Sequence, residues 1–188
     1  MKLWQKNQAP LQKIDHFTVG KDREYDLYLA AYDCQASIAH AQMLSEIGIL
    51  SQAESNQLVS VLEDLKNDAK NGDFVIETEF EDMHSKIEYV LTQKLGDLGK
   101  KIHTARSRND QVLVALHLYL KAEIETIKGL AHSFFELLMD LAEQHKNHFL
   151  PGYTHFQVAM PSTFGLWFSA YAETLVDDIM LLNGAYQI

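Results

Sequence analysis

The sequence predicts an all-α protein, and three observations support that fold class. Only nine glycines and three prolines occur in 188 residues, so residues that break helices are scarce. Pro10, Pro151 and Pro161 all lie outside the longest periodic segments. Within those segments, apolar residues recur every three or four positions, as one face of a helix requires. We therefore expect an N-terminal helical region followed by long helices of a central bundle.

The first expected helix follows an arm. Residues 1–21 have no clear period and are predicted to form an extended arm or loop. From Tyr25 to Ile47, apolar residues step by four and three along one helical face. Gly48 is placed to end this helix.

Capping patterns mark the next two helices. Ser51 and Glu54 form a capping-box pattern, which predicts a second helix that ends at Gly72. The apolar stripe of this helix consists of Leu58, Leu62 and Leu65. Thr78 and Glu81 repeat the capping pattern before a third, shorter helix.

A much longer helix is predicted from about Asn109 to about Lys146. At about 1.5 Å per residue, its roughly 38 residues would span about 57 Å. Its apolar residues occupy much of the circumference, so it must be covered from several sides. A break follows over residues 149–161, and Ser162 is expected to cap a further apolar helix. The chain resembles the front part of a larger protein, with an arm (1–21), an N-terminal helical domain (22–108) and the start of a central bundle domain (109–188).

Composition argues against several classes of function. The formal net charge of −10 at pH 7 opposes broad binding to nucleic acid or to an anionic membrane. Cys34 is the only cysteine, which excludes an internal disulfide and a thiolate metal cluster and indicates a cytoplasmic protein. No signal peptide or membrane span is visible in the sequence. Because ligand spacings for zinc and glycine-rich phosphate loops are missing as well, no metal and no cofactor are expected.

The densest polar cluster, His103 to Gln111, directly precedes the long helix. Two arginines around a serine, followed by Asn and Asp at a helix start, favour a site that binds an anion, with a carboxylate as the expected guest. Alternatively, Ser107 or Asn109 caps the helix and the arginines pair with some of the 26 acidic residues. Spacing alone leaves both interpretations open.

A second polar insertion, residues 152–157, also lies between apolar helices. It contributes the hydroxyl of Thr154 and the imidazole of His155, which favours the site interpretation. A lone histidine between helices is nevertheless more often a hydrogen-bonded core residue. Ser37 and His84 are weaker candidates, because a serine among small residues commonly serves close helix packing and His84 has no second histidine at a ligand spacing.

Three blocks of the sequence resemble the argininosuccinate lyase family of the fumarase/aspartase superfamily: DCQASIAHAQML, EDMHSKIEYVLTQKLGDLGKKIHTARSRNDQV and LPGYTHFQVAMPSTFG. The resemblance runs from about Asp22 onward. The ARSRNDQ and GYTH blocks favour this branch over fumarases and adenylosuccinate lyases. Ala105 stands where the family usually has glycine, and the residues after Trp4 depart from the family's usual opening.

The resemblance implies an enzyme, a carbon–nitrogen lyase of arginine biosynthesis that reversibly cleaves argininosuccinate to arginine and fumarate. Arg108 and Asn109 would bind a carboxylate of this small anionic substrate, and Ser37 would add a hydroxyl donor. His155 would transfer a proton, with Thr154 forming a hydrogen bond beside it. The resemblance also implies a homotetramer with active sites at the subunit interfaces.

The family's other proton carrier is a serine on a mobile Gly-Ser-Ser loop, which has no counterpart in these 188 residues. This stretch alone is therefore expected to be inactive. Two alternatives stay open: another fumarate-releasing lyase such as adenylosuccinate lyase, and a non-catalytic, crystallin-like helical protein that keeps the motifs.

Overall fold

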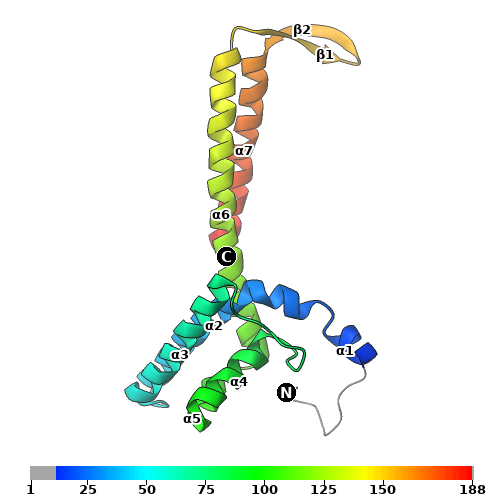
Figure 1. Ribbon diagram of the computed structural model, residues 1–188. Helices are drawn as coiled ribbons and strands as arrows, with labels where there is room; N and C mark the ends of the chain where they lie inside the picture. The colour runs from blue at the N-terminus through cyan, green and yellow to red at the C-terminus, as the bar shows by residue number, and fades with distance from the viewer. Residues whose placement is uncertain (1–11, 188) are drawn as a thin grey trace. The chain divides into compact units, whose positions relative to one another are not determined.

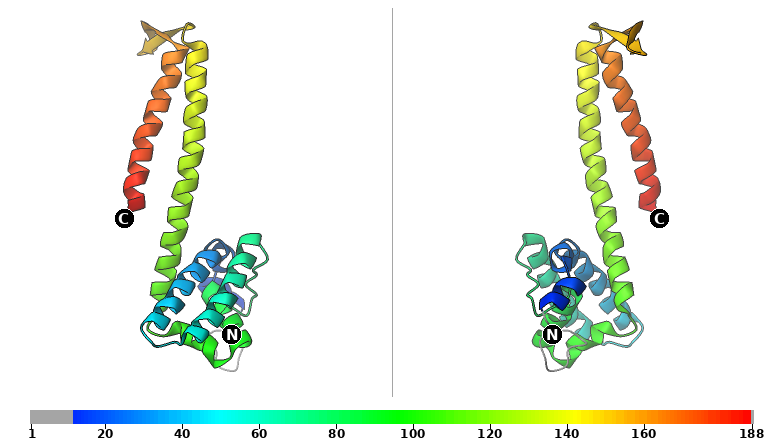
Figure 2. Two further views of the ribbon diagram at one scale, coloured as in Figure 1. Left: turned by 90° about the vertical axis from the view of Figure 1, so that its left-hand side faces the viewer. Right: turned by 90° about the vertical axis from the view of Figure 1, so that its right-hand side faces the viewer.

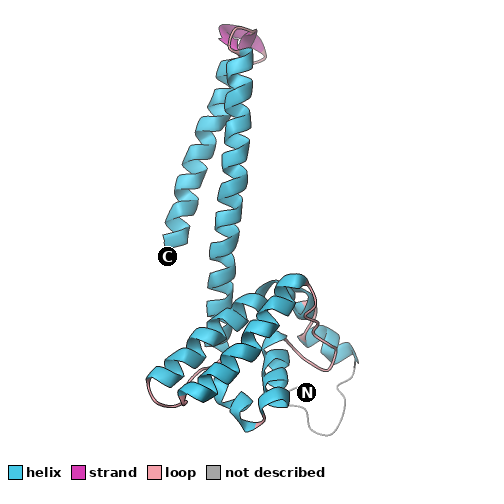
Figure 3. Cartoon of the chain, turned by 60° about the vertical axis from the view of Figure 1, so that its left-hand side comes forward, coloured by secondary structure: helices cyan, strands magenta, loops and turns pink. Residues whose placement is uncertain are grey.

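The computed structural model describes residues 12–187, and helices dominate it, with one two-stranded antiparallel sheet (Figure 1, Figure 3). In chain order the elements are α1 (Gln12–Thr18), α2 (Asp22–Glu46), α3 (Gln52–Asn71), α4 (Met83–Leu95), α5 (Asp97–Lys100), the short helix η1 (Lys101–His103), α6 (Arg108–His145), β1 (Phe149–Thr154), β2 (Gln157–Thr163) and α7 (Phe164–Gln187). The helical fold class predicted from the sequence is confirmed.

The chain divides into two compact units, a first unit of residues 1–119 and a second unit of residues 120–188. The division falls inside α6, which runs unbroken from Arg108 to His145. The three domains predicted from the sequence, 1–21, 22–108 and 109–188, stay a prediction. Among the described residues, no helix is long and apolar enough to cross a membrane.

The core of the first unit lies between α2, α3 and α4, with α2 and α3 side by side (Figure 2). Leu44 of α2, Leu58 and Leu62 of α3 and Leu91 of α4 are all fully buried. Each such side chain contributes about 1.5–3 kcal/mol relative to an exposed one. This core fixes α2 and α4, two of the three helices whose side chains meet at the candidate site.

The predicted first helix is present as α2, but its buried face differs from the apolar series that predicted it. Tyr25 and Ile47 of that series are each 60% exposed. The buried residues of α2 are instead mostly small or polar: Ala30, Asp33, Cys34, Ser37, Ile38, Ala41 and Leu44. Small side chains let the helices approach closely, so apolar periodicity does not mark this face.

Both ends of α3 are as predicted. The Ser51 side chain accepts a hydrogen bond from the Glu54 backbone N–H at 3.2 Å, and the Ser51 N–H donates to Glu54 Oε2 at 2.8 Å. Gly72 follows the helix with φ 81°, a left-handed conformation in which glycine is favoured.

The cap predicted for α4 is wrong. Asp82, rather than Thr78 with Glu81, is the N-cap, and its Oδ1 accepts from the Ser85 N–H at 2.8 Å. Asp26 of α2 also accepts from the Met83 N–H at 2.9 Å. Two carboxylates therefore accept from the Met83 and Ser85 N–H groups in the first turn of α4. A local sequence pattern reveals only Asp82, because Asp26 lies on another helix.

The arm predicted over residues 1–21 is not wholly extended, since residues 12–18 form α1; residues 1–11 lie outside the described residues. Thr18 Oγ1 donates to the Ile14 carbonyl at 2.9 Å, and Val19 directly after the helix is only 2% exposed. Burial of Val19 anchors a helix that is too short to show a period.

In the second unit, the segment predicted as a break is a hairpin of β1 and β2, with Pro151 opposite Pro161. The following helix α7 is capped by Thr163, not by Ser162 as predicted: the Leu166 N–H donates to Thr163 Oγ1 at 3.0 Å. A Cβ at Gly165 would lie 2.6 Å from the Ala142 carbonyl oxygen, so glycine allows α7 to start close against the end of α6.

Candidate active site

The polar motif before α6 begins with a sharp turn. Ala105 has φ 58°, in the left-handed region that L-residues other than Asn and Asp seldom adopt. His40 of α2 donates from Nε2 to the Thr104 carbonyl at 2.9 Å, which ties the turn to the first unit's core. Burial lowers the pKa of His40. This turn sets the direction in which the two arginines leave the backbone.

Ser107 is the cap of α6, as one of the two interpretations predicted. The Asp110 N–H donates to Ser107 Oγ at 3.3 Å, and the Ser107 N–H donates to Asp110 Oδ2 at 2.8 Å. The bond from the Ser107 backbone and a second from its hydroxyl lower the pKa of Asp110. Capping thus accounts for Ser107 and Asp110 and leaves both arginines for other partners.

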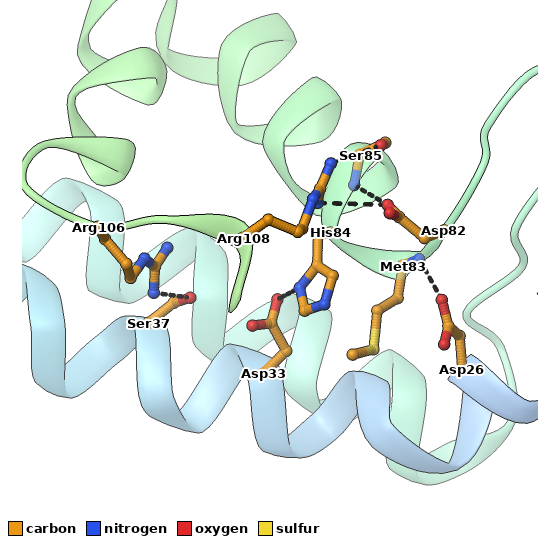
Figure 4. Close-up of polar contacts among 9 residues, drawn as sticks. All are labelled: Asp26, Asp33, Ser37, Asp82, Met83, His84, Ser85, Arg106 and Arg108. Carbon is orange, nitrogen blue, oxygen red and sulfur yellow. Dashed lines mark hydrogen bonds and ion pairs between the residues drawn. The ribbon is translucent and has the colours of Figure 1, made fainter. Parts of the chain in front are cut away.

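The two arginines are directed to different helices (Figure 4). Arg106 donates from Nη1 to Ser37 Oγ of α2 at 3.0 Å. Arg108 turns toward the start of α4, where its Nη2 donates to Ser85 Oγ at 3.1 Å and its Nη1 lies 3.3 Å from Asp82 Oδ1. The motif therefore joins α2, α4 and α6.

A buried acid–imidazole pair lies beside the arginines (Figure 4). Asp33 is fully buried and His84 is 3% exposed, with His84 Nδ1 3.1 Å from Asp33 Oδ2. The two groups are close enough for an ion pair, but their orientation does not meet hydrogen-bond geometry. Neither of these two atoms has a hydrogen-bond partner within residues 12–187. His84 thus lies beside the arginine pair (Figure 4).

The remaining predicted residue of the first unit is Asn109, in the first turn of α6, where its side chain is exposed. Ser37, by contrast, is only 1% exposed and meets the motif through Arg106. The structure thus brings Ser37 together with the Arg106–Asp110 segment.

Thr154 and His155 belong to the second unit, at the tip of the hairpin. Thr154 is paired with Gln157, so His155 and Phe156 are the two turn residues. Their φ values are 49° and 62°, both left-handed, where Asn-Gly or a similar pair is usual. Thr154, His155 and Phe156 are all exposed, and Phe156 is 100% exposed. The turn therefore presents the imidazole outward on a backbone that carries strain.

Sequence reasoning missed Asp33 as part of the cluster and assigned no role to Arg106. Asp33 precedes Ser37 by four residues, so the two share a helix face. That spacing was the available signal, but it identifies a cluster only when the buried face of α2 is known. No group of three or more His, Cys, Asp or Glu side chains suited to a metal ion occurs in the described part of the chain.

Comparison with known proteins places this chain in a family. Residues 15–188 match the family described as Lyase. The argininosuccinate lyase of Parabacteroides distasonis is 52% identical over 187 residues, which cover 100% of this chain and 42% of that protein. The argininosuccinate lyase of Thermotoga neapolitana is 42% identical, with 100% of this chain and 47% of that protein covered. The chain thus spans less than half the length of these curated relatives.

Solved structures share the fold. An EDDS lyase variant with bound fumarate superposes with a TM-score of 0.74 at 23% identity, covering 96% of this chain and 35% of that chain. The structure described as fumarate lyase:delta crystallin from Brucella melitensis gives a TM-score of 0.71 at 17% identity, covering 87% of this chain and 40% of that chain. On the match over residues 15–188, the chain belongs to the lyase family.

Proposed function

We propose that the full product of the gene is an argininosuccinate lyase, which reversibly cleaves argininosuccinate to arginine and fumarate. The observation that carries the proposal is the identity of up to 52% with argininosuccinate lyases across this whole chain, including the segment that joins α2, α4 and α6. A carboxylate guest suits that segment, because it concentrates guanidinium, amide and hydroxyl donors at a helix start.

The reaction breaks a carbon–nitrogen bond beside a carboxylate. A proton is removed from the carbon adjacent to the one that carries the nitrogen. Its removal builds a second negative charge on the carboxylate of that adjacent carbon, and the departing guanidino nitrogen gains a proton. Fixed donors around the developing charge each contribute about 2.7–4 kcal/mol. We assign this carboxylate binding to Arg108, Asn109 and the Ser37 hydroxyl.

Proton transfer is assigned to His155, with Thr154 forming a hydrogen bond beside it. An imidazole titrates near neutral pH, and a positioned acid or base typically adds about 100- to 10,000-fold to the rate. The exposed, strained hairpin tip supports this role, since strained backbone is concentrated at functional sites.

We further propose that the enzyme is a homotetramer whose active sites combine different subunits. In the second unit, large apolar side chains on α6 and α7 are exposed, among them Leu130 (68%), Leu166 (64%), Met180 (67%) and Leu181 (76%). An apolar face of this kind is usually covered by another helix or subunit. The single, buried Cys34 is consistent with a cytoplasmic enzyme.

Turnover by the full gene product tests the proposal. With purified protein, fumarate absorbance should rise when argininosuccinate is added and should not rise with adenylosuccinate. Fumarate release from adenylosuccinate alone would assign the protein to another branch of the superfamily. No fumarate from either substrate, with a folded oligomer present, would favour the non-catalytic, crystallin-like alternative.

A further inference from the structure

The two arginines of the motif are not equivalent. The side chain of Arg108 reaches the start of α4, where it contacts Ser85 and Asp82. Arg106 has a single side-chain hydrogen bond within residues 12–187, from Nη1 to Ser37 Oγ at 3.0 Å. The carboxylate-binding role proposed for Arg108 therefore leaves the function of Arg106 open.

The bond from Arg106 determines what the Ser37 hydroxyl can do. A serine hydroxyl has one hydrogen to donate and two lone pairs to accept, whereas a guanidinium only donates. Ser37 Oγ must therefore be the acceptor from Arg106, and its own hydrogen stays available. In the described residues that hydrogen is donated to no acceptor, although a helical serine commonly donates to the carbonyl four residues earlier.

Arg106 is charged, because a guanidinium is not deprotonated in proteins. Burial lowers the pKa of Arg106, and the neighbouring carboxylate of Asp33 opposes that change, followed by those of Glu88 and Asp110. Asp33 is fully buried on the same face of α2 as Ser37, one turn earlier. Arg106 is thus a fixed cation whose guanidinium is directed at Ser37 (Figure 4).

We propose that Arg106 is a positioning residue that acts through Ser37: its guanidinium occupies a lone pair of the Ser37 hydroxyl and leaves the hydroxyl hydrogen to be donated to a bound carboxylate. This inference rests on the proposed function, in which Ser37, Arg108 and Asn109 surround a carboxylate. It leaves the Ser37 hydrogen for an acceptor on the ligand, as a carboxylate oxygen supplies.

A double-mutant cycle on the full gene product tests the coupling. The proteins are the wild type, R106Q, S37A and the double variant, and the measurements are the calorimetric Kd for fumarate and kcat/KM for argininosuccinate. Since a hydrogen bond to a charged group contributes about 1.5–3 kcal/mol, S37A should weaken fumarate binding about tenfold or more. R106Q should weaken it about threefold to tenfold, and the double variant should match S37A within about twofold.

Two further variants separate positioning from folding. R106K keeps a cationic donor, so it should recover part of the affinity lost in R106Q, and only when Ser37 is present. R23K is the matched control, because Arg23 donates to the Phe80 carbonyl at 2.7 Å and to the Thr78 carbonyl at 3.1 Å, both ahead of α4 in the chain; its Kd should equal that of the wild type. If R106Q lowers the melting temperature by more than about 10 °C, the cycle is run with R106K, whose smaller penalty should also vanish beside S37A.

The outcomes are decisive. Penalties of Arg106 and Ser37 variants that multiply would overturn the inference while leaving the proposed function intact, as would a wild-type Kd for R106Q. Absence of argininosuccinate turnover with retained fumarate binding would refute the proposed substrate. The Kd values for fumarate in the four proteins would still test the positioning role of Arg106. Absence of fumarate binding by the wild type would refute both.

Discussion

Replacement of Ala105 by glycine should stabilise the first unit. Ala105 has φ 58°, and the left-handed conformation costs an L-residue about 1–2 kcal/mol. Glycine removes that cost but is freer in the unfolded chain, which offsets about 0.5–1 kcal/mol. The Ala105 side chain is exposed, so its removal loses no burial. The net gain expected for A105G is about 0.5–1 kcal/mol.

Native-state hydrogen exchange measures this gain within the first unit. The slowest amides of α2 and α3 should exchange about two- to fivefold more slowly in A105G. A39G is the matched control, because Ala39 is an exposed alanine in the interior of α2. Glycine there costs about 1 kcal/mol, so the same amides should exchange about fivefold faster. If A105G accelerated exchange as A39G does, the reasoning from the left-handed turn would be refuted.

Three other predictions concern caps, acid stability and the hairpin. S51A should cost about 1 kcal/mol by removing the α3 cap, whereas S60A at an exposed position inside α3 should cost nothing; equal urea midpoints for the two would contradict the cap. Hydrogen bonds from Lys101 and Ser51 lower the pKa of Glu54 to about 2 from 4.5, so its contribution to stability is complete above pH 4.5 and is lost as the pH falls toward 2. The urea midpoint of E54Q should therefore decrease less than that of the wild type between pH 4.5 and pH 2. An equal decrease in both proteins would argue against a contribution of Glu54 to stability. F156G should slow amide exchange in β1 and β2 about two- to fivefold by relieving φ 62°; faster exchange would argue against strain at this turn.

Helix positions could be predicted from the sequence wherever breakers and caps are local. The long helix was expected from about Asn109 to about Lys146 and is observed from Arg108 to His145, because few residues in between oppose a helix. The buried face of α2 could not be predicted, since Asp33 and Ser37 interrupt any apolar stripe. The hairpin was missed because His155 and Phe156 lack the Asn-Gly signal of a tight turn.

The candidate site was partly predictable for a similar reason. Residue types alone indicated an anion site within His103 to Gln111, with Ser37 as a weaker candidate. The resemblance assigned carboxylate binding to Arg108, Asn109 and Ser37. The bond between Arg106 and Ser37 joins residues 69 positions apart, and the turn at Ala105 precedes it directly. No sequence spacing encodes that direction, because it depends on how α2 and the start of α6 pack.

The kcat of a His155 variant tests the central claim, that the two polar insertions of this chain supply the chemistry of a lyase. In the full gene product, H155N should lower kcat for argininosuccinate about 100- to 10,000-fold with an unchanged melting temperature. H148N is the control, because His148 is an exposed histidine of the same unit that pairs with His145; its kcat should equal that of the wild type. Wild-type kcat in H155N would contradict the account.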